Sequence, residues 1–171
     1  MLRIVTANVY FHNIEIATVV KAMKLIIPPP IYMLVFAALM WMLSQYLPVY
    51  TWPLNTQYIG LGVIVLGVCI DFSSLVKFLL SKTSANPMRP ERTQVLVTTG
   101  MYRISRNPMY FGLLLLLTGW SLYVGALSAI LLIPMFILLI TKMQIQPEEI
   151  ILQELFGQKY IEYQKNVRRW I

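Results

Sequence analysis

The chain has 171 residues, of which 58% are hydrophobic and only 12% are charged. A water-soluble domain typically has about 45–50% apolar and about 25% charged residues, so this composition argues against an ordinary soluble globule. Fourteen Lys and Arg against seven Asp and Glu give a net charge of +7, which suits either a nucleic-acid surface or the basic loops of a membrane protein. The single Cys69 excludes an intramolecular disulfide, and the single His12 argues against a histidine metal cluster.

The N-terminal region lacks the compact apolar core and small-residue cleavage site of a signal peptide, so we expect none. In residues 13–26, polar side chains recur every third residue among apolar ones. This pattern predicts an amphipathic helix lying in the membrane interface. The three prolines at 28–30 then end that helix, because proline cannot continue a helix interior.

Two tracts without any charged residue dominate the sequence, one between Lys24 and Asp71 and one between Arg106 and Lys142. A bilayer crossing needs about 17–25 helical residues, so each tract is long enough for two crossings. The expected transmembrane helices cover 31–47, 57–80, 108–123 and 126–142. We therefore predict one membrane-embedded domain over 1–171. It is an all-α polytopic fold with about four transmembrane helices, an N-terminal interfacial helix and a C-terminal cytosolic helical segment.

The charges indicate an orientation. The connecting loops at 48–56 and 124–125 carry none, whereas the segment 82–106 and the stretch from Lys142 onward carry most of them. By the positive-inside rule the charged face is cytoplasmic, with both termini inside, in a bacterial inner membrane or the endoplasmic reticulum. Such a distribution favours a membrane over nucleic acid. An aromatic belt is expected at the opposite interface, formed by Tyr46, Tyr50, Trp52, Tyr58, Trp120 and Tyr123.

One candidate site lies where the third span begins. Asn107 is a good N-cap, and the missing N–H of Pro108 costs nothing at a helix start. Arg103 and Arg106 flank this helix N-terminus, which therefore suits an anion such as a carboxylate. The alternative is that both arginines only mark the cytoplasmic interface, and charge alone favours that alternative.

Three acids are further candidates. Pro147 is expected to open a helix with Glu148 and Glu149 in its first turn, where acids often serve only the helix dipole. Glu148 follows the last span on the same side as Arg106, so its carboxylate could accept hydrogen bonds from a ribose or balance a cationic ligand. Asp71 lies inside a predicted span, which suggests a function, although pairing with an arginine or snorkelling to water explains it equally well.

The segment 96–112 (LVTTGMYRISRNPMYFG), the pair Glu148-Glu149 and the segment 156–163 (FGQKYIEY) resemble one known superfamily. It is that of the integral-membrane isoprenylcysteine carboxyl methyltransferases and phospholipid methyltransferases. The resemblance covers roughly residues 87–170, and the N-terminal half matches only as hydrophobic helices. It implies S-adenosylmethionine bound by the cytosolic segments 82–106 and 143–171, and a lipophilic acceptor entering from the bilayer.

The resemblance also implies roles for individual residues. Glu148, Arg106 and Asn107 would act at the reaction centre, and Gln144 and Asp71 would lie on the acceptor side. The expected cofactor contacts are Gln94, Leu96, Val97, Tyr102, Arg103, Asn107, Pro108, Met109, Tyr110 and Glu148. The isoprenylcysteine branch has histidine in place of Asn107 and arginine in place of Gln144, and these departures argue against isoprenylcysteine as the acceptor.

Methyl transfer from a sulfonium needs chiefly positioning and a desolvated pocket, which suits a chain with few acid–base residues. The acceptor group could be a carboxylate, an amine or a thiol, and no metal or nucleic-acid partner is expected. Two other classes stay open. One is a non-catalytic four-helix membrane protein for lipid binding or assembly, and the other is a sterol-reductase-like membrane reductase that would need a nicotinamide.

Overall fold

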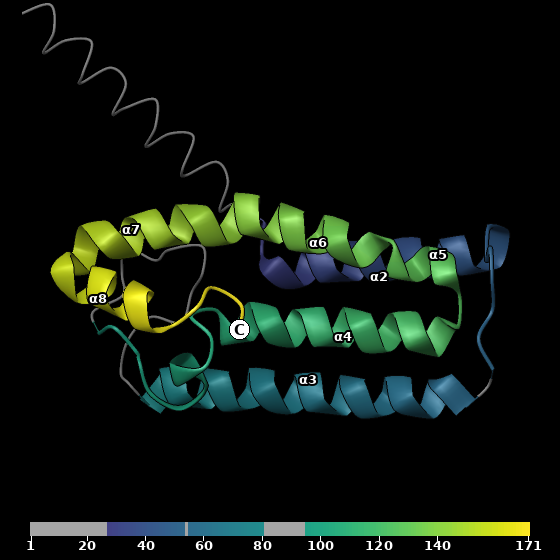
Figure 1. Ribbon diagram of the computed structural model, residues 1–171, viewed down its shortest axis with the longest axis horizontal. Coiled ribbons are helices and arrows are strands. Elements are labelled where there is room, and N and C mark those ends of the chain that lie inside the picture. The colour runs from purple at the N-terminus through teal and green to yellow at the C-terminus, as the bar shows by residue number, and fades with distance from the viewer. Residues whose placement is uncertain (1–26, 54, 81–94) are drawn as a thin grey trace, which may run out of the picture.

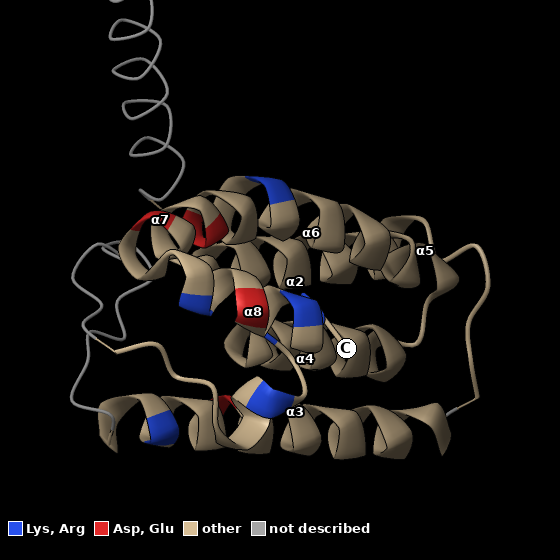
Figure 2. Ribbon diagram, turned by 60° about the vertical axis from the view of Figure 1, so that its left-hand side comes forward, with Lys and Arg blue, Asp and Glu red and all other residues tan. Residues whose placement is uncertain are grey.

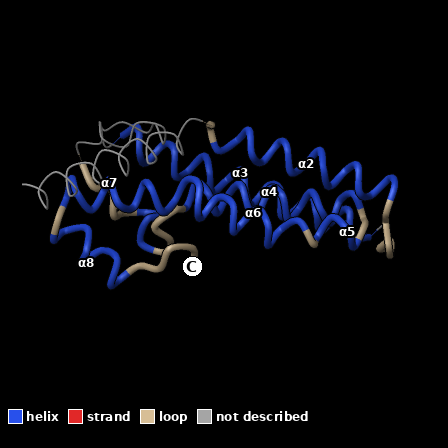
Figure 3. Tube along the Cα trace, turned by 90° about the horizontal axis from the view of Figure 1, so that it is seen from above, coloured by secondary structure: helices blue, strands red, loops and turns tan. Residues whose placement is uncertain are grey.

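The computed structural model describes residues 27–53, 55–80 and 95–171. The expected interfacial helix 13–26 and the residues 82–94, with Gln94, lie outside these ranges. Within them the chain forms helices and loops, and Figure 3 shows no strand in the part described. The predicted all-α membrane fold is confirmed.

Three helices lie side by side in Figure 1. They are α2 (Pro29–Tyr46), α3 (Asn55–Leu80) and α4 (Pro108–Val124). The short 3-10 turn η2 (Gly100–Arg103) precedes α4. By length and composition α3 can cross a membrane, and α4 is a shorter apolar helix.

The rest of the chain forms one long rod and a return helix. The rod consists of four consecutive helical pieces, α5 (Leu127–Ile130), α6 (Leu132–Ile140), the π-helical turn η3 (Thr141–Ile145) and α7 (Gln146–Phe156). Together they make 30 continuous helical residues, again long and apolar enough to cross a membrane. Helix α8 (Gln158–Asn166) then folds back beside α7 (Figure 1).

The helix that was expected to open at Pro147 continues the preceding helix without a break. Pro147 does lie in the first turn of α7, but the flanking Ile145 and Gln146 keep right-handed helical angles. A proline inside a helix has no N–H to donate to the carbonyl four residues earlier, and its ring crowds that carbonyl. The wider π-helical turn η3 ends at Ile145, two residues before Pro147, and accommodates this misfit in the hydrogen-bond ladder.

Helix α3 buries only small residues, namely Gly60, Gly67 and Ser74. A Cβ built on Gly60 would lie 2.6 Å from the carbonyl oxygen of Gly119 on α4, and one on Gly67 would lie 3.0 Å from the carbonyl oxygen of Gly112. The glycines repeat every seven residues along both antiparallel helices, so the two backbones meet along their length. Small residues that allow such close approach are typical of helix packing in membranes.

The outward face of α3 is apolar. Val65, Phe72 and Leu79 are each more than half exposed, at 61%, 67% and 61%. A soluble monomer rarely shows so continuous an apolar surface, whereas lipid chains would cover it without cost. On the inner side, Met40, Leu117 and Phe136 are fully buried between α2, α4 and α6. The exposure pattern therefore fits a bundle surrounded by hydrocarbon.

Charged and aromatic residues separate along the bundle. In the described part of the chain, Figure 2 shows the charged residues on α7, α8, η2, η3 and the nearby half of α3, with none near α5. Aromatic pairs lie towards the α5 end, where Tyr50 meets Trp52 edge to face and Trp120 stacks on Tyr123. This separation is the pattern from which the orientation was predicted.

The two loops at the α5 end are joined to each other. The Trp52 N–H donates to the Gly125 carbonyl, and the Leu127 N–H donates to the Tyr50 carbonyl, both at 2.9 Å. Gly125 ends α4 with a left-handed φ of 73°, a conformation that glycine adopts without strain. The end of the bundle away from the charges is therefore held closed.

Candidate functional site

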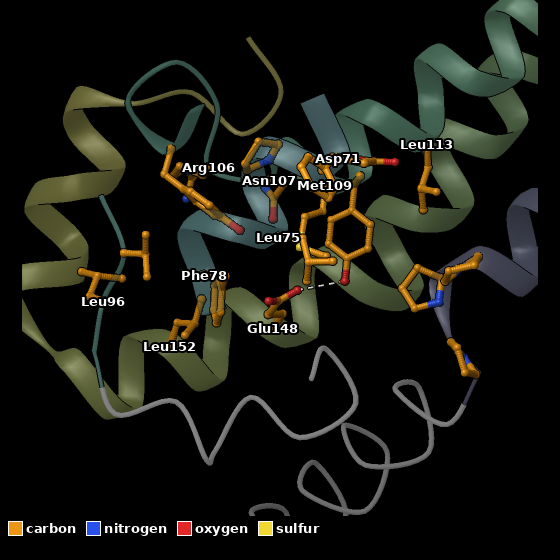
Figure 4. Close-up of a pocket in the computed structure, with 18 of the residues that line it drawn as sticks. Asp71, Leu75, Phe78, Leu96, Arg106, Asn107, Met109, Leu113, Glu148 and Leu152 are labelled. Carbon is orange, nitrogen blue, oxygen red and sulfur yellow. Dashed lines mark hydrogen bonds between the residues drawn. The ribbon is translucent and has the colours of Figure 1, made fainter. Parts of the chain in front are cut away.

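A cavity of about 590 Å³ lies at the charged end of the bundle, between α3, α4, α7 and the prolines that precede and begin α2 (Figure 4). Its size falls within the range of small-molecule sites, about 300–1,000 Å³. Most of the lining is apolar, including Val68, Phe72 and Leu75 from α3. A few polar side chains stand among these apolar ones, which is the usual composition of a ligand site.

Ten residues expected at the site line this cavity. They are Asp71, Leu96, Val97, Tyr102, Arg106, Asn107, Pro108, Met109, Tyr110 and Glu148. Arg103 is exposed and does not line it. Gln144 is buried but does not line the cavity. Its Nε2 donates to the Ile27 carbonyl at 3.0 Å.

Glu148 is held by a tyrosine from another helix. The Tyr110 hydroxyl donates to Glu148 Oε2 at 3.0 Å, shown by the dashed line in Figure 4. Tyr110 lies in the first turn of α4 and is buried, whereas Glu148 lies in the first turn of α7. Residues 38 positions apart in the sequence are thus joined at the cavity wall. The second carboxylate oxygen of Glu148 keeps its capacity to accept from a ligand.

Asn107 occupies the N-cap position of α4, but its side chain does not cap the helix, contrary to the prediction. Instead its Nδ2 donates to the Arg169 carbonyl at 3.0 Å, and its own N–H donates to Ser105 Oγ at 3.1 Å. The segment after α8 returns to the start of α4 (Figure 1), and its Arg169 carbonyl binds the Asn107 side-chain amide through Nδ2. Asn107 therefore connects the start of α4 to the segment after α8 and also lines the cavity.

Glu149 binds two arginines. Arg169 donates Nε to Oε1 at 3.0 Å and Nη2 to Oε2 at 2.6 Å, a bidentate arrangement. Arg106 contributes an ion pair, with Nη1 3.1 Å from Oε1. The side chains of Arg106 and Glu149 are each only 10% exposed. Among the described residues, Arg106 Nε has no hydrogen-bond partner although it is buried.

Tyrosines close the side of the cavity next to α8. The Tyr163 hydroxyl donates to the Tyr102 carbonyl at 2.6 Å, fixing α8 on η2. Burial raises the pKa of Tyr102 and of Tyr163 well above the ordinary value. Burial also raises the pKa of Tyr160 to about 12, with the Glu149 carboxylate adding to the effect and Arg106 opposing it. All three phenols therefore stay protonated, and hence able to donate, at neutral pH.

Several residues of the site were not anticipated from the sequence. Phe78 and Leu152 line the cavity, and the Phe78 ring lies 5.9 Å from that of Tyr102 between centroids. Nothing distinguishes these two residues from their apolar neighbours. Arg169 was also missed, although the basic pair at 168–169 in a short stretch ending in Trp170 and Ile171 was a usable signal.

Comparison with curated proteins finds relatives of two kinds. An uncharacterized protein of Haemophilus influenzae is 44% identical over 63 residues, which is 37% of this chain and 100% of that protein. Protein-S-isoprenylcysteine O-methyltransferase B of Arabidopsis thaliana is 31% identical over 112 residues, 63% of this chain and 55% of that protein. Protein-S-isoprenylcysteine O-methyltransferase of Schizosaccharomyces pombe is 28% identical over 111 residues, 65% of this chain and 47% of that protein. This chain thus matches about half the length of the two methyltransferases.

No solved structure matches this chain significantly. A family model does, and its description is phospholipid methyltransferase. The match covers residues 55–159, more than half of the chain, and includes α3, α4 and α7, which build most of the cavity. The chain therefore belongs to the phospholipid methyltransferase family.

Proposed function

We propose that this protein transfers a methyl group from S-adenosylmethionine to a lipophilic acceptor at the cytosolic membrane face. One observation carries the proposal. The cavity joins Glu148 of α7 to the first turn of α4, with Arg106 in its wall, at the charged end of an apolar bundle. The family match and the relatives named as O-methyltransferases support the same reaction class.

The charges of the cavity suit this cofactor. S-adenosylmethionine carries a carboxylate, an ammonium group and a sulfonium, and the lining offers Arg106 for the anion and Glu148 for a cation or ribose hydroxyl. Among the described residues the buried Arg106 Nε has no hydrogen-bond partner, which fits an anion supplied by a ligand. Leu96 and Val97 offer apolar surface to a base. When bound, the cofactor supplies an electrophilic methyl group on a cationic sulfur.

The remaining lining suits a lipid-like acceptor. Val68, Phe72 and Leu75 contribute both to the cavity and to the apolar helix α3, so an acceptor can keep its chain in hydrocarbon while its polar end enters. Asp71 lies on the same stretch and is the acidic group on this side. We propose that it faces the reacting end of the acceptor, which is a carboxylate, an amine or a thiol.

Gln144 and the other predicted residues take secondary places in this proposal. Gln144 binds the Ile27 carbonyl next to the prolines 28–30, which line the cavity, so it would act on the acceptor only through that wall. Arg103 is exposed and would contact the membrane surface. The charged end would face the cytosol, with both termini on that side.

Calorimetry on detergent-purified protein tests the proposal. Wild type is expected to bind S-adenosylmethionine, and Glu148→Ala and Asn107→Ala are expected to lose about tenfold or more in affinity. Tyr58→Phe is the control, since Tyr58 is 77% exposed and lies towards the other end of α3. Absence of binding in the wild type would refute the proposal and favour a non-catalytic membrane protein. A nicotinamide requirement would favour a reductase.

A further inference from the structure

The ion-pair cluster beside the cavity has unequal partners. Arg169 holds both oxygens of Glu149 with two hydrogen bonds, whereas Arg106 meets the same carboxylate through one ion pair without hydrogen-bond geometry. Arg169 does not line the cavity and Arg106 does. The guanidinium with more hydrogen bonds to Glu149 is therefore the one that lies outside the cavity lining.

The single carboxylate of Glu149 is shared unequally between the two arginines. Glu149 carries one negative charge against the two positive charges of Arg106 and Arg169, so these three side chains together keep one net positive charge. The bidentate geometry gives Arg169 the larger share, because paired N–H···O bonds on a carboxylate are the strong form of this interaction. Arg106 Nη1 faces Glu149 in the ion pair, and Arg106 Nε, buried and without a hydrogen-bond partner among the described residues, is left for another anion.

The position of Arg106 is fixed independently of its charge. Its backbone N–H donates to the Arg168 carbonyl at 3.0 Å, and the neighbouring Asn107 donates to the Arg169 carbonyl. The segment after α8 thus holds the backbone of residues 106 and 107 with its own backbone. The same segment also binds the Glu149 carboxylate through the side chain of Arg169.

We infer that Arg169 is a positioning residue, and this inference rests on the proposed function. By occupying Glu149 it leaves the Arg106 guanidinium available to bind the carboxylate of the cofactor's amino-acid portion. Without Arg169, Glu149 and Arg106 would pair fully, and the cavity would lose its anion-binding group while keeping its shape. Arg169 itself touches neither the cofactor nor the acceptor.

Two nucleoside probes separate this role from a merely structural one. S-adenosylhomocysteine carries the amino-acid carboxylate, and methylthioadenosine keeps the adenosine and the thioether but lacks that carboxylate. In Arg169→Ala the affinity for S-adenosylhomocysteine is expected to fall about tenfold, as for loss of a charge-assisted hydrogen bond. The affinity for methylthioadenosine is expected to stay within about twofold, because its binding does not use Arg106.

A second variant tests the route through Glu149. In the double variant Arg169→Ala/Glu149→Gln the competing carboxylate is gone, so Arg106 becomes available again. The preference for S-adenosylhomocysteine is then expected to return towards the wild-type value. Arg168→Ala is the matched control, since it removes an equal charge from an exposed neighbouring side chain and keeps the backbone carbonyl that binds residue 106.

The outcomes are distinct. Equal loss of both probes in Arg169→Ala would show a structural role only, and no loss of either would show that Arg169 has no effect on the cavity. Each of these results overturns the inference while leaving the proposed function in place. Wild-type protein that binds neither probe would overturn the proposed function, and the inference with it.

Discussion

The carboxylate of Asp71 on α3 fills the space that any side chain at Gly112 of α4 would need. A Cβ built on Gly112 would collide with Oδ1 of Asp71, and its carboxyl carbon also lies within clashing distance. Asp71 Oδ1 is buried and makes no hydrogen bond among the residues described. The absence of a side chain at position 112 is thus what allows an acidic group to stand at the cavity wall.

Gly112→Ala is expected to be destabilising, because the added methyl group must displace the Asp71 carboxylate. Overpacking of this kind costs about 1–3 kcal/mol. The check is thermal unfolding of detergent-purified protein. Gly62→Ala is the control, since a Cβ at Gly62 meets nothing within 4 Å and alanine is the better helix former. Equal stability of the two variants would contradict the close contact.

Tyr110→Phe is expected to weaken S-adenosylmethionine binding by about two- to tenfold. The variant removes the 3.0 Å hydrogen bond to Glu148 and leaves a half-buried carboxylate with one partner fewer, which costs about 0.5–1.5 kcal/mol. Titration calorimetry measures the change. Tyr123→Phe, at the opposite end of α4, serves as the control. A variant that binds as tightly as wild type would show that Tyr110 does not position Glu148 for the cofactor.

Asp71→Asn is expected to keep cofactor affinity within about twofold and, where the acceptor is an amine or thiol that gives its proton to Asp71, to slow methyl transfer by about 100-fold, the lower range for general base catalysis. Asparagine has the same shape, so the contact with Gly112 persists. Transfer of a labelled methyl group from S-adenosylmethionine into a membrane lipid extract gives the rate. Unchanged transfer would reduce Asp71 to a packing role.

Stability is expected to fall at alkaline pH. Burial raises the pKa of Tyr160 to about 12 and raises the pKa of Tyr163 further, whereas unfolded tyrosines have a pKa of about 10. Above pH of about 10 the folded state therefore keeps protons that the unfolded state has lost. The stabilisation is complete below that pH and is lost as the pH rises through the folded pKa values.

Tyr163→Phe tests this pH dependence. At neutral pH it costs about 1–3 kcal/mol, because the buried Tyr102 carbonyl loses its 2.6 Å partner. Between pH of about 10 and 12 the decline in stability becomes shallower than in wild type, since one titrating group is gone. Denaturant unfolding across this range measures both effects. An unchanged slope would show that the Tyr163 phenol does not contribute to alkaline unfolding.

The sequence predicted what depends on hydropathy and local chemistry. The tracts without charge located α3 and α4, and the Asn107-Pro108 pair located the start of α4. Glu148 and Arg106, placed on one face from charge, do line one cavity. Pro147 and the two acids after it located the first turn of α7, whereas the π-helical turn before α7 depends on packing around the helix and leaves no simple sequence signal.

Long-range contacts account for most of what was missed. The bond from Asn107 to the Arg169 carbonyl joins residues 62 positions apart, and no local pattern indicates it. The contact between Gly60 and Gly119 was readable in principle, since glycines recur every seven residues in both helices. Their pairing required knowing that the two helices lie against each other.

The hydrogen-bonded loops at the α5 end hold the neighbouring ends of α3 and α4 together. Two backbone hydrogen bonds tie the loop before α3 to the loop after α4, and the cavity lies at the opposite end of those helices. A helix of 26 residues is about 39 Å long, so a tilt of about 3° at the tied end moves its far end by about 2 Å. For the lipid-like acceptor proposed above, a small angular change of these long helices would be enough to widen the cavity.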